Sequence, residues 1–388
     1  MKNIFVVTGS RAEYGLLKNI LKGIQLSKKL NLNIVITGSH ISKKHGLTYT
    51  EIINDGFTDL HIVDMQLVDD SSENITKSMG FGLIGFAKLL NKLSADLLII
   101  TGDRYEAFVA SSAAMIAKIP IAHIHGGEIT EGAIDDSIRH AITKLSHLHF
   151  VAIDEYKNRV IQMGENPNNV YCIGGLGAHA ITKTSIYSRN ELEAALQIKL
   201  KKINLLITYH PETLGKTSIE NQIHQVLSAL EEFTNANLIF TSPNADMGGN
   251  YINNAIKNFV SKTSNAYLFS SLGQKKYFSC LAHFDCVIGN SSSGIMEAPS
   301  FQVPTVNIGD RQKGRIMAKS IINCECNSKS IKKAIEKSLS DEFKRKLKFV
   351  NNPYVQKNTI NKLIEIIEEI NLKDLLQKKF YDIKIPGK

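Results

Sequence analysis

The sequence predicts an α/β protein with two doubly wound halves, each built on a parallel sheet, facing a central cleft. The chain has 388 residues, more than one hydrophobic core usually supports, so two domains are expected. Short apolar runs rich in β-branched residues alternate with longer segments of helical period, a pattern typical of parallel sheets. A polar stretch at residues 182–188 separates two such series.

The expected elements divide the chain into two domains and a tail. In the first half, strands are expected at residues 4–8, 32–37, 96–101, 120–124, 147–152 and 170–173, and helices at 16–24, 73–93, 105–118, 135–146 and 154–163. In the second half, strands are expected at 204–209, 237–241, 285–288 and 305–308. We therefore expect domains at 1–175 and 176–369, and a tail at 370–388 that returns to the first domain.

Composition limits the function classes. Lysine and arginine outnumber aspartate and glutamate by 46 to 37. Such an excess of positive charge is compatible with binding to nucleic acid, to an anionic membrane or to a phosphorylated substrate. The basic cluster at 344–348 reads as a solvated helix face, with Phe343 and Phe349 on its buried side, so no nucleic-acid partner is expected. No apolar run is long enough to span a membrane, and five cysteines without a C-x-x-C pair favour a reduced, cytoplasmic protein.

Two motifs with arginine follow predicted strands of the first half. The turn Thr8-Gly9-Ser10-Arg11 offers backbone N–H groups and a guanidinium to an anion, although a plain structural turn explains it equally well. Gly102-Asp103-Arg104 places a carboxylate beside a guanidinium, as a proton-transfer group next to a phosphate clamp would require. A helix cap at Asp103 is the competing interpretation.

The segment at the end of the strand expected at 120–124 contains more candidate residues than the two motifs above. In His123-Ile124-His125-Gly126-Gly127-Glu128, strand alternation places both histidines on one face, and the glycines allow a ligand to approach. No third candidate ligand follows at a spacing typical of metal sites. An acid–base or hydrogen-bonding role is therefore favoured over metal binding. His123 fits a core position as well as a functional one. Asp135 and Asp136 open a helix, where a capping role competes with catalysis.

The second half adds polar loops after its strands. They contain His210, Asn244, the serine turn Ser291-Ser292, Glu297 and Arg311. Serine and backbone donors suit a diphosphate, and Glu297 suits ribose hydroxyls. Each loop alone is compatible with an ordinary turn, and their common position at strand ends supports a site.

At these motifs the chain resembles the hydrolysing UDP-N-acetylglucosamine 2-epimerases, above all at 102–104, 135–144 and 289–315. The resemblance implies two Rossmann-like domains of the glycosyltransferase-B type, with no metal and no nicotinamide cofactor. It implies conversion of UDP-N-acetylglucosamine and water to UDP and N-acetylmannosamine through a glycal, in sialic-type acid biosynthesis. The implied UDP contacts are Arg11, Arg104, His210, Asn244, Ser291, Ser292, Glu297 and Arg311.

The same resemblance implies catalytic roles for Asp103 and Asp135. Several members have glutamate where this chain has His125. His125 itself, or Glu128 in its place, is therefore the expected proton-transfer group. Relatives with histidine there include enzymes acting on diacetylbacillosamine nucleotides, the alternative substrate, linked to UDP or GDP. A glycosyltransferase of the same fold is the alternative of another class. We expect a homodimer or homotetramer.

Overall fold

The computed structural model describes residues 1–43, 46–215, 217–243 and 247–383. By contacts the chain divides into two compact units, and it passes between them four times. Unit 1 comprises residues 1–128, 135–179 and 354–388, and unit 2 comprises 129–134 and 180–353. This division differs from the domains expected at 1–175 and 176–369, chiefly because residues 354–369 belong to unit 1 and the segment 129–134 to unit 2. The domains expected at 1–175 and 176–369 stay a prediction.

Unit 1 is built on a parallel sheet with the strand order β3-β2-β1-β4-β5-β6-β7. The strands are β1 Lys2–Thr8, β2 Leu30–Ile36, β3 Leu60–Ile62, β4 Leu97–Thr101, β5 Ile121–Ile124, β6 Leu148–Val151 and β7 Val170–Cys172. The helices are α1 Arg11–Leu26, α2 Tyr49–Asn54, α3 Ser72–Lys92, α4 Tyr105–Ile116, α5 Asp135–Leu145, α6 Asp154–Gln162, α7 Leu176–Ile181 (which runs on into unit 2) and α15 Thr359–Glu369, with short 3-10 turns η1 Gly38–Ile41, η3 Pro167–Asn169 and η5 Leu372–Leu375.

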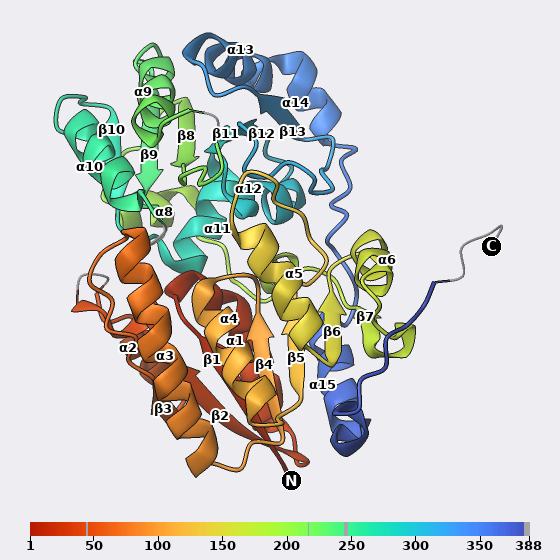
Figure 1. The fold of residues 1–388 in the computed structure, drawn as a ribbon. Coiled ribbons are helices and arrows are strands. Elements are labelled where there is room, and N and C mark those ends of the chain that lie inside the picture. Colours follow the sequence, from red (N-terminus) through yellow and green to blue (C-terminus); the bar gives the residue numbers. More distant parts are fainter. Residues whose placement is uncertain (44–45, 216, 244–246, 384–388) are drawn as a thin grey trace. The chain divides into compact units, whose positions relative to one another are not determined.

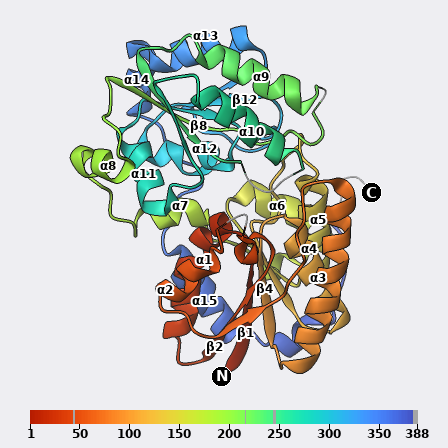
Figure 2. The same cartoon turned by 90° about the vertical axis from the view of Figure 1, so that its left-hand side faces the viewer.

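Strand alternation explains the two helical layers of unit 1. Along β1, Ile4 and Val6 pack with α1, α2 and α15, whereas Phe5 and Val7 pack with α3, α4 and α5. Figure 2 shows these two layers on opposite sides of the sheet, with α1 and α2 on one side and α3, α4 and α5 on the other. Because both faces are covered, the central strands β1, β4 and β5 are mostly apolar, whereas β2 nearer the edge begins with the alternating residues Leu30, Asn31, Leu32 and Asn33.

Unit 2 repeats this plan with the strand order β10-β9-β8-β11-β12-β13 (Figure 1). Its strands are β8 Ile203–Thr208, β9 Ala236–Thr241, β10 Ala266–Phe269, β11 Cys286–Gly289, β12 Thr305–Ile308 and β13 Ile321–Cys324. Its helices are α8 Arg189–Leu196, α9 Ile219–Leu230, α10 Gly249–Val260, α11 Gly273–His283, α12 Ser292–Met296, α13 Ser328–Leu339 and α14 Asp341–Leu347, with η4 at Ala298–Phe301. The predicted fold class, two doubly wound parallel-sheet domains, is confirmed.

The basic cluster at 344–348 lies on α14 and just beyond it. Phe343 packs against the core of unit 2, as expected, but the expectation for Phe349 is wrong. Phe349 lies past the end of α14, and 87% of it is exposed. Within the ranges that the structure describes, no helix is long and apolar enough to cross a membrane, and no group of three or more histidine, cysteine or acidic side chains is placed to hold a metal ion.

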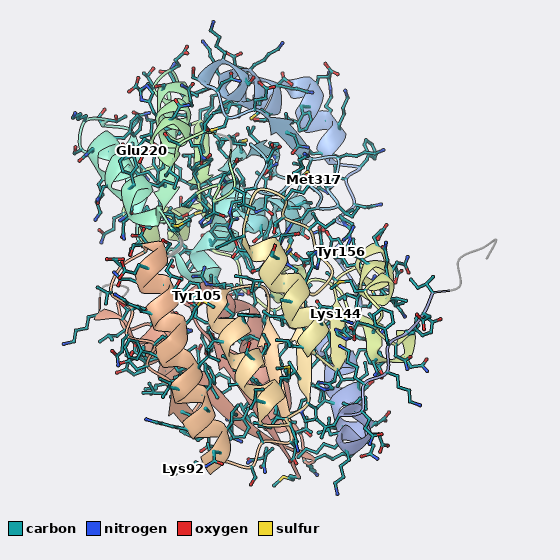
Figure 3. The ribbon with its side chains drawn as sticks, viewed as in Figure 1. Lys92, Tyr105, Lys144, Tyr156, Glu220 and Met317 are labelled. Atoms are coloured by element: carbon teal, nitrogen blue, oxygen red, sulfur yellow. The ribbon has the colours of Figure 1, made fainter. Side chains whose placement is uncertain are left out.

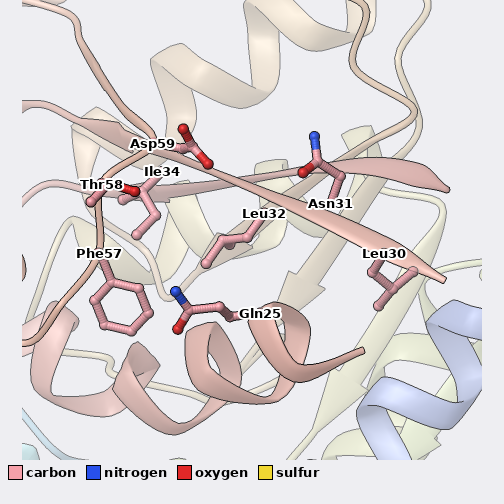
Figure 4. Close-up of a pocket in the computed structure, with 8 residues that line it drawn as sticks. All are labelled: Gln25, Leu30, Asn31, Leu32, Ile34, Phe57, Thr58 and Asp59. Atoms are coloured by element: carbon pink, nitrogen blue, oxygen red, sulfur yellow. The ribbon is translucent and has the colours of Figure 1, made fainter. Parts of the chain in front are cut away.

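A small pocket of about 100 Å³ lies in unit 1 beside β2 (Figure 4). Its lining residues are Gln25, Leu30, Asn31, Leu32, Ile34, Phe57, Thr58 and Asp59. None of them belongs to the motifs at the carboxyl ends of the strands, and the lining has no group suited to proton transfer except the exposed Asp59. The motifs at the strand ends are therefore the better candidates for a functional site.

The C-terminal tail is fastened to unit 1 by a buried carboxylate. Glu165, 2% exposed, accepts hydrogen bonds from Lys144 (2.6 Å), from Lys378 in the tail (2.7 Å) and from His149 (3.0 Å). Burial acts to raise the pKa of Glu165, but these three donors outweigh it and lower the pKa to about 2. Next to Lys378, Phe380 fills the space above Gly164.

Glu165→Gln is expected to lower the unfolding free energy at neutral pH. The folded pKa of about 2 lies well below the ordinary 4.5, which corresponds to on the order of 3 kcal/mol. The ionised form therefore stabilises the fold above pH 4.5, and this contribution is lost as the pH falls from 4.5 towards 2. Chemical denaturation of both proteins across this range measures it. A difference between variant and wild type that stays constant with pH would contradict the assignment.

Candidate active site

The candidate residues of unit 1 follow three neighbouring strands. Gly9-Ser10-Arg11 follows β1, Gly102-Asp103-Arg104 follows β4, and the segment 125–128 follows β5. Strands β1, β4 and β5 are hydrogen-bonded neighbours and run parallel, so their carboxyl ends meet at one edge of the sheet. The β1/β4 pair is the point where the strand order reverses, which is where doubly wound sheets bind ligands.

Arg11 stands in the first turn of α1 and already has an anionic partner. Ser10 caps this helix by accepting a hydrogen bond from the Glu13 N–H, so the turn has a structural role. The Arg11 guanidinium forms two contacts with Glu51, at 3.0 and 2.6 Å, and its side chain is 35% exposed. Glu51 therefore competes with any phosphate for this arginine.

Asp103 is held by a buried arginine. The Arg139 guanidinium, 1% exposed, donates to the Asp103 carboxylate, to the Asp136 carboxylate (3.2 Å) and to the Glu128 carbonyl oxygen (3.0 Å). Arg104, not Asp103, is the N-cap residue of α4, and no side chain caps that helix. The cap interpretation of Asp103 is therefore wrong, and its carboxylate, 23% exposed, is oriented by a fixed cation.

Arg104 is oriented by its own neighbours. Its Nε lies 3.2 Å from a carboxylate oxygen of Glu106, which is 2% exposed, and its guanidinium lies over the ring of Tyr105 at 5.5 Å. Tyr105, labelled in Figure 3, begins α4. Because the Arg104 side chain is itself only 17% exposed, both contacts are well shielded from solvent. This arginine is preorganised at the strand edge.

His123 and His125 do not share a face, in contrast to the expectation. Strand β5 ends at Ile124, and His125 has a left-handed backbone with φ of 67°. His123 is fully buried and contacts the Gly102 carbonyl oxygen at 2.7 Å and the Thr143 hydroxyl at 3.2 Å. Burial lowers the pKa of His123 to about 3, so it is a neutral core histidine that supports the loop containing Asp103.

The left-handed turn brings His125 to Glu128. The His125 Nδ1 lies 2.7 Å from the Glu128 carboxylate, and both side chains are buried. The Leu176 N–H points to the His125 Nε2 at 3.4 Å. Because a backbone N–H only donates, Nε2 is the accepting nitrogen, and the ring proton lies on Nδ1, directed to the carboxylate. A proton transferred to Nε2 would have to replace this long contact with the Leu176 N–H.

Asp135 and Asp136 both stand in the first turn of α5 and are partly buried. Asp136 pairs with Arg139 at 3.2 Å and lies 3.5 Å from the His140 ring. The sequence reasoning missed Arg139. An arginine between Ile138 and Ile142 on the apolar side of a helix is a signal that would have revealed it, because a buried guanidinium needs carboxylate partners.

In unit 2 the predicted loops are joined by Asn290. Its side chain accepts from the His210 N–H (2.7 Å) and donates to the His210 carbonyl oxygen (2.8 Å), which ties the ends of β8 and β11. Its own carbonyl oxygen accepts from Arg311 (3.2 Å) and Gln312 (2.8 Å) after β12. Asn290 is fully buried, and it brings His210 and Arg311 together at one edge.

The remaining candidates of unit 2 lie around α12. Ser291 is the N-cap residue of this short helix, Ser292 is its first residue, and Glu297, 7% exposed, follows its last. Ser291 and Ser292 are partly buried, and no side chain caps the helix. Asn244 lies outside the described residues.

Comparison with known proteins identifies the family. A family model described as UDP-N-acetylglucosamine 2-epimerase matches residues 22–368. A GDP/UDP-N,N'-diacetylbacillosamine 2-epimerase (hydrolyzing) of Campylobacter jejuni is 42% identical over 98% of this chain and 99% of its own length. The chain belongs to the UDP-N-acetylglucosamine 2-epimerase family. The resemblance seen in the sequence is thus confirmed, and membership of this family of epimerases supports an enzyme.

Two further relatives of the family match over nearly the same length. Polysialic acid biosynthesis protein P7 of Escherichia coli is 38% identical over 99% of this chain and 98% of its own length. A UDP-N,N'-diacetylbacillosamine 2-epimerase (hydrolyzing) of Legionella pneumophila is 32% identical over 98% of this chain and 99% of its own length.

Solved structures of the family share the fold. UDP-GlcNAc 2-epimerase from Neisseria meningitidis bound to UDP-GlcNAc is similar with a TM-score of 0.77 and 18% identity, covering 95% of this chain and 99% of that one. The S. aureus MnaA-UDP co-structure has the same TM-score at 18% identity and covers 99% of this chain and 100% of its own. At this identity the likeness supports the architecture of two parallel-sheet domains alone.

Proposed function

We propose that this chain hydrolyses a nucleotide-linked 2-acetamido sugar and inverts carbon 2, converting UDP-N-acetylglucosamine and water to UDP and N-acetylmannosamine. The observation that supports this most is a pair of proton-transfer candidates after adjacent strands. Asp103 follows β4 and is held by Arg139, and His125 follows β5 and is held by Glu128. Each reactive group is thus fixed by a second, buried side chain.

The reaction requires two opposed proton-transfer groups. One takes the proton from carbon 2 while the bond between carbon 1 and the UDP oxygen breaks, which leaves a glycal with a double bond between these carbons. Water then adds its oxygen to carbon 1 and gives up one proton to a carboxylate of the site, while a second group delivers a proton to carbon 2 from the opposite face, so the configuration inverts. We propose that Asp103, His125 and Asp135 share these proton transfers, and that Glu128 orients His125 or replaces it as the base.

The nucleotide contacts form a second part of the proposal. A departing UDP gains negative charge, so donors and cations that are oriented in advance stabilise its departure. Arg104 is oriented by Glu106 and Tyr105, and His210 and Arg311 are brought together by Asn290. The proposed contacts are Arg11, Arg104, His210, Asn244, Ser291, Ser292, Glu297 and Arg311. The proposal needs no redox cofactor, because no step transfers electrons, and it assigns the stabilisation of the departing UDP to these side chains in place of a metal.

A second substrate is supported by the relatives. Two of the similar proteins, at 42% and 32% identity, are named for N,N'-diacetylbacillosamine, linked to GDP or UDP in one and to UDP in the other. The chemistry at carbons 1 and 2 is the same, and the difference lies at carbons 4 and 6 of the sugar. The name of the E. coli relative supports a place in the biosynthesis of sialic-type acids. We further propose that the enzyme is a homodimer or homotetramer.

An NMR time course in deuterated water tests the reaction and the substrate together. The purified protein is mixed separately with UDP-N-acetylglucosamine and with UDP- and GDP-diacetylbacillosamine. We expect one of them to yield free nucleoside diphosphate and a sugar of inverted carbon 2 with deuterium at that carbon. A chelator should leave the rate unchanged. Release of nucleotide only when an acceptor sugar is added would overturn the proposal in favour of a glycosyltransferase.

A further inference from the structure

The C-terminal tail closes the end of helix α5. Lys378 in the tail donates hydrogen bonds to the carbonyl oxygens of Lys144 (2.8 Å) and Ser146 (2.7 Å), in and just beyond the last turn of the helix. Carbonyl groups at a helix end have no partner within the helix, and a cation there also interacts favourably with the helix dipole. Lys378 therefore caps the C-terminus of α5, although it lies 232 positions after Ser146 in the sequence.

Two further contacts hold the tail against this helix end. The ammonium group of Lys378 lies 2.7 Å from the buried Glu165 carboxylate, which also accepts a hydrogen bond from Lys144 at 2.6 Å. Lys144, labelled in Figure 3, places its own ammonium group over the ring of Phe380 at 5.1 Å. Because the Lys378 side chain is only 24% exposed, its contacts with α5 are partly shielded from solvent and salt.

The other end of the same helix carries groups of the candidate site. Asp135 and Asp136 stand in its first turn. One turn later, Arg139 donates to the Asp103 carboxylate and to the Glu128 carbonyl oxygen. The position of α5 along its axis therefore affects where the Asp103 carboxylate is held.

Buried polar contacts connect the capped end of α5 to Arg139. The Thr143 hydroxyl lies 3.1 Å from the Arg139 carbonyl oxygen and 3.2 Å from Nδ1 of His123 in strand β5, and all three residues are at most 1% exposed. At about 1.5 Å per residue, the capped carbonyl group of Lys144 lies about 8 Å along the helix from Arg139. Hydrogen bonds weaken steeply when their geometry changes, so a shift of α5 along its axis would disturb these contacts together.

We propose that Lys378 is a positioning residue for the reaction: by capping α5 it holds Arg139, and through Arg139 the Asp103 carboxylate, in the orientation that proton transfer requires. This inference rests on the proposed function, since it takes Asp103 as a proton-transfer group. Displacement of a reacting group by about 1 Å can lower a rate by about 100-fold. Lys378 thus acts on turnover through α5 and not through contact with the substrate.

The test compares Lys378→Met with Lys379→Met in the full-length protein. Methionine keeps an unbranched apolar side chain but has no donor, so Lys378→Met removes the cap of α5. Lys379 is the exposed neighbour, and Lys379→Met removes the same charge from the same tail. We expect Lys378→Met to lower kcat at least about tenfold, with UDP affinity within about twofold of the wild type. Lys379→Met should match the wild type in both.

Counting the active molecules separates positioning from a loss of folded protein. Turnover is therefore expressed per UDP-binding site, counted by calorimetric titration of the same preparation. Unfolded molecules bind no UDP, so a variant that is only less stable loses binding sites and keeps its turnover per site, a result that would contradict the proposal. Lys378→Arg should keep kcat within about threefold of the wild type, because a guanidinium also donates to carbonyl and carboxylate oxygens.

Amide hydrogen exchange of residues 135–146 follows α5 independently of catalysis. Lys378→Met should speed exchange in this segment at least about tenfold, whereas α13 in unit 2 should exchange as in the wild type. Faster exchange with unchanged kcat would overturn the positioning role and leave the proposed reaction untouched. A wild type that turns over none of the nucleotide sugars would overturn the proposed function, and with it the role of the tail in that reaction.

Discussion

Asp103→Asn is expected to lower turnover by at least about 100-fold while UDP binds nearly as well as to the wild type. The substitution keeps the size of the side chain and its place beside Arg139, but it removes the group that takes up or releases a proton. General acid–base groups typically contribute about 100-fold or more. A residue that acts only in the proton-transfer steps changes kcat without changing the affinity for the nucleotide, so rates and UDP affinity are measured on the same preparation.

The structure offers a matched control for this prediction. Asp136 shares the same Arg139 guanidinium at 3.2 Å, so Asp136→Asn removes an equivalent ion pair without touching Asp103. If the effect of Asp103→Asn came from a disturbed Arg139, both variants would lose activity alike. We expect Asp136→Asn to keep turnover within about threefold, because Asp103 still pairs with the Arg139 guanidinium in this variant. Equal losses in the two variants would remove Asp103 from the proton-transfer steps.

The sheets were predictable because hydrophobic periodicity depends on local sequence. Strand β12 was expected at 305–308 and lies there, and α3, α4, α5 and α6 differ from their expected limits by at most two residues. Three edge or outer strands, β3, β10 and β13, were not expected. They have only three or four residues each and are partly exposed, so they lack a strong apolar run.

The details of the candidate site depend on contacts that are distant in sequence. The carboxylate of Asp103 meets Arg139, 36 residues later, and nothing near Asp103 shows that it has a partner. The left-handed backbone of His125 is a further case. Strand alternation predicts that His125 shares a face with His123. The strand ends at Ile124, however, so the alternation no longer applies to His125. The Asn290 network likewise joins three strand ends that lie far apart along the chain.

The passage of the chain from one unit to the other and back could not be predicted from sequence patterns either. The segment 129–134 belongs to unit 2 although it stands between β5 and α5 of unit 1. Its backbone is bound there, since the Glu131 N–H donates to Lys313 and the Gly132 carbonyl oxygen accepts from Leu214. A segment of this length is too short for its composition to show that it belongs to the other unit. Unit 1 resumes at Asp135, the first residue of α5, without a linker that could have been recognised.

His125→Ala is expected to abolish most turnover with little change in nucleotide affinity. We propose that the ring takes the proton at Nε2, in place of the 3.4 Å contact with the Leu176 N–H, while Nδ1–H points to Glu128 at 2.7 Å and keeps the ring oriented. His125→Glu should recover part of the activity, because a carboxylate is able to fill the same role. Glu128→Gln should have a smaller effect, since it removes the orienting charge and leaves the ring in place.

His125→Asn distinguishes proton transfer from hydrogen bonding. At φ of 67° an alanine is strained, whereas asparagine tolerates the left-handed region, so the asparagine variant tests the chemistry without disturbing the backbone. If His125 only positions the substrate, His125→Asn should stay active, and if it transfers the proton, this variant should be as slow as His125→Ala. Exchange of the carbon 2 hydrogen with deuterated water provides a second measurement. A His125→Ala enzyme that exchanges and turns over normally would rule out His125 as the base, and Glu128 would then be the group to test.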